Sequence, residues 1–189
     1  MATGLIDVVP DVPGLARGQE RALVRYCPVC DAYEATDRRL AVYGPLELAR
    51  SKCQFLRAYS KRVTLLPTTT GCSDPELTAA GVSIAASTPA AFRLTGNAVE
   101  VRLQSGDMME FDALYPSLGA HVCSDLARSL GARINDVGCV QVSDKQETTI
   151  SGLYATGDVV SDLHQLAVAE GHAAVAATAI HNSLPHVWR

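Results

Sequence analysis

Two cysteines one helical turn apart, Cys27 and Cys30, are the residues of this sequence best suited to chemistry. Two intervening residues let a pair of thiols close a small, reducible disulfide ring. At a helix start, the free N–H groups and the helix dipole would stabilise one thiolate and activate it as a nucleophile. Asp31 follows Cys30 and could carry the proton that moves in each half of a thiol–disulfide exchange. The stretch therefore predicts a redox dithiol.

A structural zinc site is the alternative for the same pair. Zinc of that kind takes four ligands, commonly from a second Cys-x-x-Cys or a close pair of histidines. The remaining cysteines stand singly and far apart, at Cys53, Cys72, Cys123 and Cys139. We expect these four to be small buried hydrophobic residues rather than ligands or parts of a disulfide framework. The spacing thus favours redox chemistry, and we predict no metal.

The size and charge of the chain limit the number of domains, the binding partners and the cellular locations that we expect. A chain of 189 residues allows one large domain or two small ones, with a core that needs no disulfides. A net charge of −4 gives no electrostatic case for nucleic acid or for an anionic membrane. The N-terminus lacks the pattern of a secretory signal, and no apolar run has the length of a membrane span. We expect a cytoplasmic protein with neither of these partners.

Hydrophobic periodicity predicts a βαβ unit after the cysteine pair. It is followed by a short helix, a strand and a three-stranded meander with Gly-containing turns. The expected order is strand 40–43, helix 46–59, strand 62–66, helix 75–80, strand 82–85, and meander strands 91–94, 98–103 and 108–115.

The last third predicts a short helix at 124–130, a strand at 139–142 and a long helix at about 163–181. The long helix is apolar nearly all round, so we expect it to be buried against a sheet.

These pieces together resemble the flavin-dependent thioredoxin reductases, a branch of the pyridine nucleotide-disulfide oxidoreductases. The stretch Cys27 to Glu34 is similar to the family's redox motif, with Ala32 where the family usually has Gly, and Gly152 to Asn182 is similar to its C-terminal flavin segment. The resemblance implies an α/β, three-layer, Rossmann-related FAD/NAD(P)-binding fold. A nucleotide-binding-like domain would be inserted into a flavin-binding domain of which only the C-terminal part is substantial. The expected segments are 1–16, a remnant of the first flavin half, then 17–115, the insert with the cysteines, and 116–189.

The resemblance also implies roles at matching positions. Cys30 would be the sulfur nearest the flavin, Cys27 the one that exchanges with substrate, and Asp31 the acid–base group. Asp158 would accept a hydrogen bond from the flavin's ribityl chain, and His164 and Gln165 would open a helix aimed at its ring system. The full expected set of flavin contacts is Gly157, Asp158, Val159, His164, Gln165 and Leu166. Considered without the rest of the motif, Asp158 is also typical of a turn or cap residue, and His164 is typical of a surface residue near a helix start.

The sequence departs from the family at the expected site for the flavin pyrophosphate. The family's Gly-x-Gly-x-x-Gly loop after its first strand is absent, and residues 1–16 match only the end of that half. Backbone N–H groups of such a loop neutralise much of the dinucleotide's charge. We therefore expect an N-terminally truncated family member that binds FAD weakly or only with a partner.

A second departure lies in the insert. Gly44, Leu46 and Ala49 fall in register with a Gly-x-Gly-x-x-Ala fingerprint, but Leu46 replaces the glycine that lets the backbone approach a pyrophosphate. Pro45 removes an N–H and Glu47 adds negative charge. About twenty residues further on, where a ribose-binding acid or a phosphate-binding arginine is typical, the sequence has neither. We predict that NAD(P)H binding is lost.

Three functions remain open at this stage. The first is a flavin-dependent dithiol/disulfide oxidoreductase, of the reductase or dithiol oxidase type, acting on a small dithiol or a thioredoxin-like protein. The second is a catalytically degenerate member that folds and binds a partner, and the third is a flavin-free thiol–disulfide exchanger. Because a missing flavin half would leave apolar surface uncovered, we expect a homodimer or a complementing flavin-domain chain.

Overall fold

The computed structural model describes residues 1–160 and 163–185, which form two compact units. One unit is Val9–Gly119; the other combines Met1–Val8 with the chain from Ala120 onward. These borders differ from the expected segments 17–115 and 116–189. Assignment of either unit as a flavin or nucleotide domain remains a prediction.

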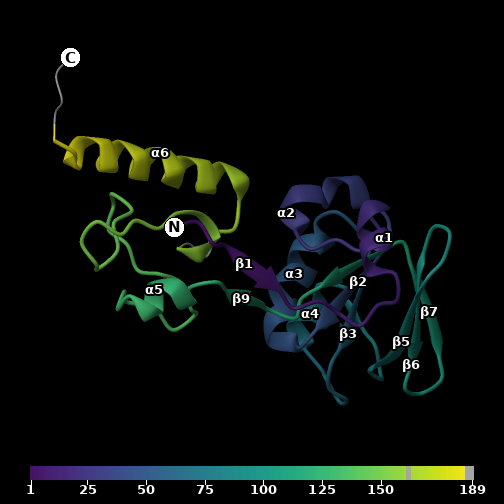
Figure 1. The fold of residues 1–189 in the computed structure, drawn as a ribbon. Coiled ribbons are helices and arrows are strands. Elements are labelled where there is room, and N and C mark those ends of the chain that lie inside the picture. Colours follow the sequence, from purple (N-terminus) through teal and green to yellow (C-terminus); the bar gives the residue numbers. More distant parts are fainter. Residues whose placement is uncertain (161–162, 186–189) are drawn as a thin grey trace. The chain divides into compact units, whose positions relative to one another are not determined.

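A four-stranded parallel sheet, in the order β4-β3-β2-β8, organises the unit Val9–Gly119. Its strands are β2 (Arg39–Gly44), β3 (Arg62–Pro67), β4 (Ser83–Ile84) and β8 (Ala113–Pro116). Figure 1 labels β2 and β3 of this sheet. Helix α3 (Leu46–Arg57) connects β2 to β3, as the predicted βαβ pattern requires, and α4 (Pro75–Ala79) connects β3 to β4. An antiparallel sheet of β5 (Pro89–Leu94), β6 (Val99–Leu103) and β7 (Met108–Phe111) completes the layers with the short helices α1 (Leu15–Glu20), α2 (Pro28–Asp31) and η1 (Tyr33–Ala35).

The central strands are apolar on both faces because both faces are covered. Leu40 and Val42 of β2 pack in the cluster that contains α3 and α4, whereas Ala41 packs in the cluster with the β5–β7 sheet. On that second side, the rings of Tyr43 and Phe92 lie 5.0 Å apart between centroids. The parallel sheet is therefore the middle layer of the unit, which positions the loops at its strand ends.

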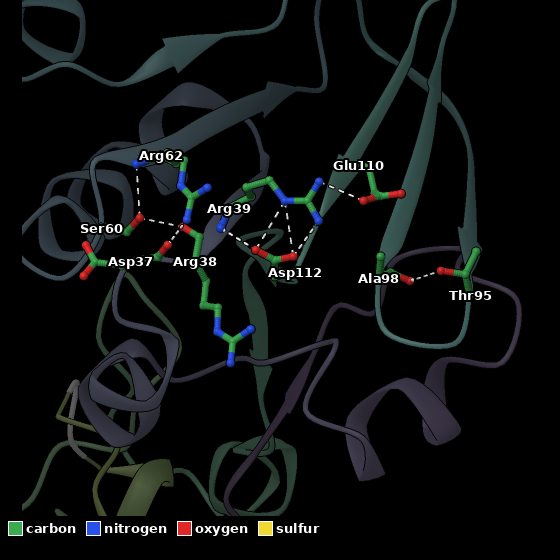
Figure 2. A network of polar contacts seen from close by, with 9 residues as sticks. All are labelled: Asp37, Arg38, Arg39, Ser60, Arg62, Thr95, Ala98, Glu110 and Asp112. Carbon is green, nitrogen blue, oxygen red and sulfur yellow. Dashed lines mark hydrogen bonds and ion pairs between the residues drawn. The ribbon is translucent and has the colours of Figure 1, made fainter.

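The predicted strand 108–115 is wrong as a single element, because it divides into β7 and β8, which belong to different sheets. The break lies at Asp112. Its backbone N–H donates to the Arg39 carbonyl, and its carboxylate accepts from the Arg39 backbone N–H and guanidinium (Figure 2). These bonds direct the chain from the antiparallel sheet into the parallel one.

The other unit contains the two-stranded antiparallel sheet of β1 (Leu5–Asp7) and β9 (Ala120–Val122), then α5 (Asp125–Ser129), η2 (Gly157–Val159) and α6 (Leu166–Ser183). The predicted strand 139–142 is present only as isolated bridges, Ile134 to Val140 and Val142 to Thr148. Short irregular segments replace a ladder here.

The prediction that the long C-terminal helix is buried against a sheet is wrong. Ala176 is the only buried residue among the described positions of α6, and Leu166 is 77% exposed. The apolar character comes largely from alanine, and residues 120–160 form short bridges and turns rather than a sheet broad enough to cover the helix. An apolar sequence shows that burial is favourable, but it does not supply the surface that buries it.

Candidate functional site

The cysteine pair forms a disulfide at the start of α2, as its spacing predicts. Cys27 is the N-cap of this four-residue helix, Pro28 occupies its first turn, and the Cys30 N–H donates to the Cys27 carbonyl at 3.0 Å. The two Cα atoms lie 5.3 Å apart and the sulfurs are bonded. Cys30 is an exposed residue and Cys27 is half-buried. The helical turn thus holds the disulfide at the surface of its unit, where another molecule can reach Cys30.

The carboxylate of Asp31 is held from two sides. The Tyr115 hydroxyl donates to Asp31 Oδ1 at 2.9 Å, and Arg25 Nη1 lies 3.6 Å from Asp31 Oδ2. Tyr115 is fully buried in the core, whereas the Asp31 side chain keeps 25% of its surface exposed. Burial and the hydrogen bond to Asp31 raise the pKa of Tyr115, so its hydroxyl stays a donor at neutral pH. Asp31 is therefore a carboxylate fixed in position directly after Cys30, and its acid–base role stays a prediction.

Arg25 connects the residues on either side of the disulfide through its hydrogen bonds and ion pairs. Its Nε donates to the Ala22 carbonyl at 2.9 Å, and Nη1 donates to the Asp31 carbonyl at 3.1 Å and pairs with Glu34 at 3.3 Å. Ala22 has a positive φ of 54°, an uncommon conformation for alanine, which forms part of the turn before Arg25. Arg25 thereby links the turn before the disulfide to the helix that carries it.

Lys52 of α3 anchors the chain just before the cysteines. Its ammonium donates to the Tyr26 carbonyl at 3.1 Å and to the Pro116 carbonyl at 2.6 Å. Sequence reasoning missed Lys52, Tyr115 and Arg25 as parts of this site. Tyr115 is 84 positions from Asp31, so no local pattern indicates the contact.

The expected nucleotide loop is a direct strand-to-helix junction. Gly44 ends β2, Pro45 is the N-cap of α3, and the helix begins at Leu46. A side chain at Gly44 would overlap the backbone oxygen of Ser117, so this glycine is required by packing alone. The N–H groups of Leu48 and Ala49 already donate to the Pro45 carbonyl, and Glu47 is exposed in the first turn. The proline also lacks an N–H, so this junction has one backbone donor fewer than a Gly-x-Gly-x-x-Ala loop. Loss of NAD(P)H binding stays a prediction.

The expected flavin contacts separate into two groups in the other unit. Gly157 and Asp158 of η2 line a cleft of about 380 Å³ together with Thr156, the N-cap of η2. The rest of the lining is Ala2 and Gly4 near the N-terminus and Ala169, Glu170 and Ala173 of α6. Gly157 has a φ of 75°. The Val159 side chain lies in the core, so only the backbone of Val159 could touch a ligand. Small side chains beside a half-buried carboxylate fit the ribityl part of a flavin.

His164, Gln165 and Leu166 do not belong to the lining of that cleft. Gln165 is the N-cap of α6, as expected for a residue that opens the helix, and His164 and Leu166 are exposed. Their flavin contacts remain predictions. The cysteine pair lies in one unit and these residues lie in the other.

The four single cysteines are only partly as expected. Cys53 and Cys139 are buried, whereas Cys72 and Cys123 are half-buried. Burial raises the pKa of Cys53 to about 12, which makes it a poor nucleophile at neutral pH. Within residues 1–160 and 163–185, His, Cys, Asp and Glu form no group of three that could hold a metal ion. Over the same residues, no helix has the length and apolarity to span a membrane.

The chain is similar to known proteins over most of its length. The family model described as pyridine nucleotide-disulphide oxidoreductase matches residues 1–177. Thioredoxin reductase tcpT of Claviceps purpurea (strain 20.1) is 30% identical over 189 residues, which cover 92% of this chain and 59% of that protein. Coenzyme A disulfide reductase of Staphylococcus haemolyticus (strain JCSC1435) is 35% identical over 65 residues, 34% of this chain and 15% of that one.

Two solved structures have the same fold over nearly the whole chain. The match to the crystal structure of HlmI has a TM-score of 0.85 at 25% identity, and it covers 96% of this chain and 58% of the HlmI chain. The match to thioredoxin reductase of Streptococcus pyogenes MGAS5005 has a TM-score of 0.80 at 24% identity, and it covers 96% of this chain and 63% of the reductase chain. These matches confirm the expected Rossmann-related α/β fold. The chain spans less than two thirds of the length of each of these relatives.

Proposed function

Because the chain belongs to the pyridine nucleotide-disulphide oxidoreductase family, we propose that it acts in flavin-dependent dithiol/disulfide exchange. In this proposal, electrons pass between a thiol substrate, the Cys27–Cys30 pair and FAD. The observation that carries it is the surface disulfide at a helix start, with Asp31 beside it held by Tyr115 and Arg25. This arrangement gives the pair an accessible sulfur and a positioned proton carrier.

The exchange itself uses only residues of one unit. A substrate thiolate attacks one sulfur, the Cys27–Cys30 bond breaks, and the displaced thiolate takes up a proton, for which Asp31 is the candidate donor. A second substrate thiolate then attacks the substrate sulfur of this mixed disulfide and displaces the cysteine thiolate, which takes up a proton. The protein is left as a dithiol and the substrate as a disulfide. Two electrons have moved from the substrate to the cysteine pair. In the reverse direction the same steps reduce a substrate disulfide.

For FAD, the residues that would hold the ribityl part are Gly157 and Asp158, with Gln165 at the start of α6 near the ring system. When bound, FAD supplies a two-electron acceptor and donor for the cysteine pair. We propose that this chain binds FAD weakly or together with a partner chain, because the contacts named here are to the ribityl part and the ring system and not to the pyrophosphate.

The electron direction we favour is oxidation of a dithiol. The junction at Gly44, Pro45 and Leu46 does not fit the pyrophosphate of NAD(P)H, so a supply of electrons from that cofactor is disfavoured. The substrate in this proposal is a small dithiol or a thioredoxin-like protein. A homodimer and a cytoplasmic location stay predictions.

A flavin-free thiol–disulfide exchanger is the second candidate. One observation favours it: the disulfide, Asp31, Tyr115 and Arg25 all lie in the unit Val9–Gly119, so the exchange chemistry is complete without the other unit. A partner-binding role without catalysis is the third candidate, for which the exposed apolar helix α6 is the relevant feature.

The visible spectrum of the purified chain distinguishes these functions. We expect a flavin band, at full or partial occupancy, that bleaches when a dithiol is added under nitrogen and does not bleach in the Cys30→Ser variant. Cys123→Ser, which removes a half-buried cysteine outside the pair, is the control and should behave like the parent. A colourless protein whose disulfide still opens with dithiol supports the second candidate. A disulfide that no thiol opens leaves only the partner-binding role.

A further inference from the structure

A polar cleft of about 380 Å³ lies in the same unit as the disulfide, and three arginines line it. Arg21 and Arg25 come from the segment between α1 and α2, and Arg38 precedes β2. The remaining polar lining groups are Asn97 and the carboxylates of Glu34 and Asp112. A small cleft lined by converging polar groups is a typical ligand site.

Both carboxylates of this cleft are already neutralised by partners. Glu34 pairs with Arg25 at 3.3 Å. Asp112 receives the Arg39 guanidinium at 2.6 Å on Oδ1 and the Arg39 backbone N–H at 2.7 Å on Oδ2 (Figure 2). These bonds to Arg39 hold the pKa of Asp112 below its usual value, so it stays ionised and paired at neutral pH.

Two of the arginines keep donors available. Arg21 makes one side-chain hydrogen bond, from Nη1 to the Thr95 carbonyl at 3.2 Å. Within residues 1–160 and 163–185, the Arg38 guanidinium has no hydrogen bond or ion pair, and Figure 2 shows it extending away from the Arg39 network. The cleft therefore offers positive charge and planar guanidinium donors that the protein itself does not use.

Arg25 connects this cleft to the disulfide. Its guanidinium lines the cleft and also contacts the carbonyl and carboxylate of Asp31, the residue after Cys30. Glu34 and Ala35, which line the cleft, belong to η1 directly after α2. The segment 25–35 thus carries the redox pair and forms one wall of the cleft.

We propose that this cleft binds the anionic group, a carboxylate or a phosphate, of the thiol substrate that reacts at Cys27–Cys30. The inference rests on the proposed thiol–disulfide function and adds its substrate class. Guanidinium groups bind carboxylates and phosphates through paired N–H donors, which orients the bound group as well as attracting it. Arg21 and Arg38 bind the anion, and Arg25 fixes the position of the cleft relative to the disulfide.

The test compares three thiols that differ in charge. 3-Mercaptopropionate carries a carboxylate, 4′-phosphopantetheine carries a phosphate, and 2-mercaptoethanol is neutral. The rate at which each opens the Cys27–Cys30 disulfide in the full chain is followed by alkylation and mass spectrometry. In the variant Arg21→Gln with Arg38→Gln, we expect the rate with one or both anionic thiols to fall at least about fivefold, and the rate with 2-mercaptoethanol to change less than about twofold. The two anionic thiols show whether the cleft prefers a carboxylate or a phosphate.

A charge-matched control uses Arg17→Gln with Lys61→Gln, two exposed positions of the same unit that do not line this cleft. This variant should leave all three rates near the parent values. Raising the salt concentration to about 0.5 M should reduce the advantage of the anionic thiols in the parent, because salt screens exposed charges. Binding of inorganic pyrophosphate, measured by calorimetry, should weaken at least fivefold in the Arg21/Arg38 variant only.

The outcomes separate the two proposals. If no thiol opens the disulfide of the parent chain, the proposed exchange function is wrong and this inference falls with it. If the disulfide opens, but the Arg21/Arg38 variant slows charged and neutral thiols alike or slows none, the anion cleft is wrong and the exchange function stands. Equal slowing in the control variant would show a general charge effect and would also overturn the cleft.

Discussion

The Tyr115 hydroxyl lies 2.9 Å from Asp31 Oδ1 and donates a hydrogen bond to it, although 84 positions separate the two residues. Tyr115 comes from β8 in the middle of the core, and Asp31 ends the helix that carries the disulfide. The parallel sheet therefore fixes the acid beside the redox pair through a buried side chain.

Replacing Tyr115 with Phe tests the role of this contact. The hydrogen bond fixes the Asp31 carboxylate beside Cys30, so its removal should slow disulfide opening severalfold. In a chain that already carries Asp31→Asn, adding Tyr115→Phe should slow the reaction no further. Stability should fall by about 1–2 kcal/mol, since the bond joins a buried donor to a charged acceptor. Stopped-flow exchange with 2-mercaptoethanol at neutral pH measures the rates of the two single variants and of the double variant. An unchanged rate in Tyr115→Phe, with reduced stability, would leave Tyr115 a purely structural role.

The Gly44 position should be intolerant of any side chain, whether or not a nucleotide binds. A methyl group there would overlap the Ser117 carbonyl oxygen, so Gly44→Ala should destabilise the unit by about 1–3 kcal/mol. Gly96→Ala is the control, because a side chain at that position meets nothing within 4 Å. Urea unfolding measures both. Equal midpoints for the two variants would contradict the packing explanation.

NADPH binding should be absent from the parent chain, and substitutions in the first turn of α3 should restore part of it. With the Leu46 side chain and the Glu47 charge in the first turn of α3, we expect no saturable binding at micromolar concentrations. Leu46→Gly with Glu47→Gln should tighten binding at least about tenfold, because the backbone can then approach a pyrophosphate without charge repulsion. Leu48→Gly with Glu47→Gln alters the same turn without restoring the fingerprint and should gain less. Tight binding by the parent would show that Leu46 is tolerated.

Stability should decrease in alkaline solution for an identifiable reason. Burial raises the pKa of Cys53 from 9.0 to about 12, and burial with the Asp31 bond raises that of Tyr115. Both groups therefore keep their protons in the folded state at a pH where the unfolded chain releases them. Their contribution is full below the unfolded pKa and is lost as pH rises above it, at up to about 1.4 kcal/mol per pH unit for each group.

Chemical unfolding between about pH 8 and pH 10.5 measures this loss. The Cys53→Ala variant should be less stable at pH 8, because a buried group is removed, but its stability should fall less steeply with pH. A slope identical to that of the parent would mean that other groups cause the alkaline loss.

Local pattern was sufficient for much of the fold. The short, largely apolar runs at 40–43 and 62–66 and the amphipathic run from Leu46 predicted the βαβ unit, since these signals depend only on neighbouring residues. The run 108–115 was predicted as one strand because nothing in its hydrophobicity marks the change of sheet at Asp112. That change depends on Arg39, which is 73 positions away.

The cysteine pair was identifiable by sequence alone, because its spacing encodes the geometry of a reducible disulfide within one helical turn. The family assignment rested on the same local motifs in their order along the chain. Only the tertiary structure revealed which groups hold Asp31, where three arginines converge, and that α6 stays uncovered among the described residues. Contacts between residues distant in the chain depend on how whole elements pack, and no local pattern records that packing.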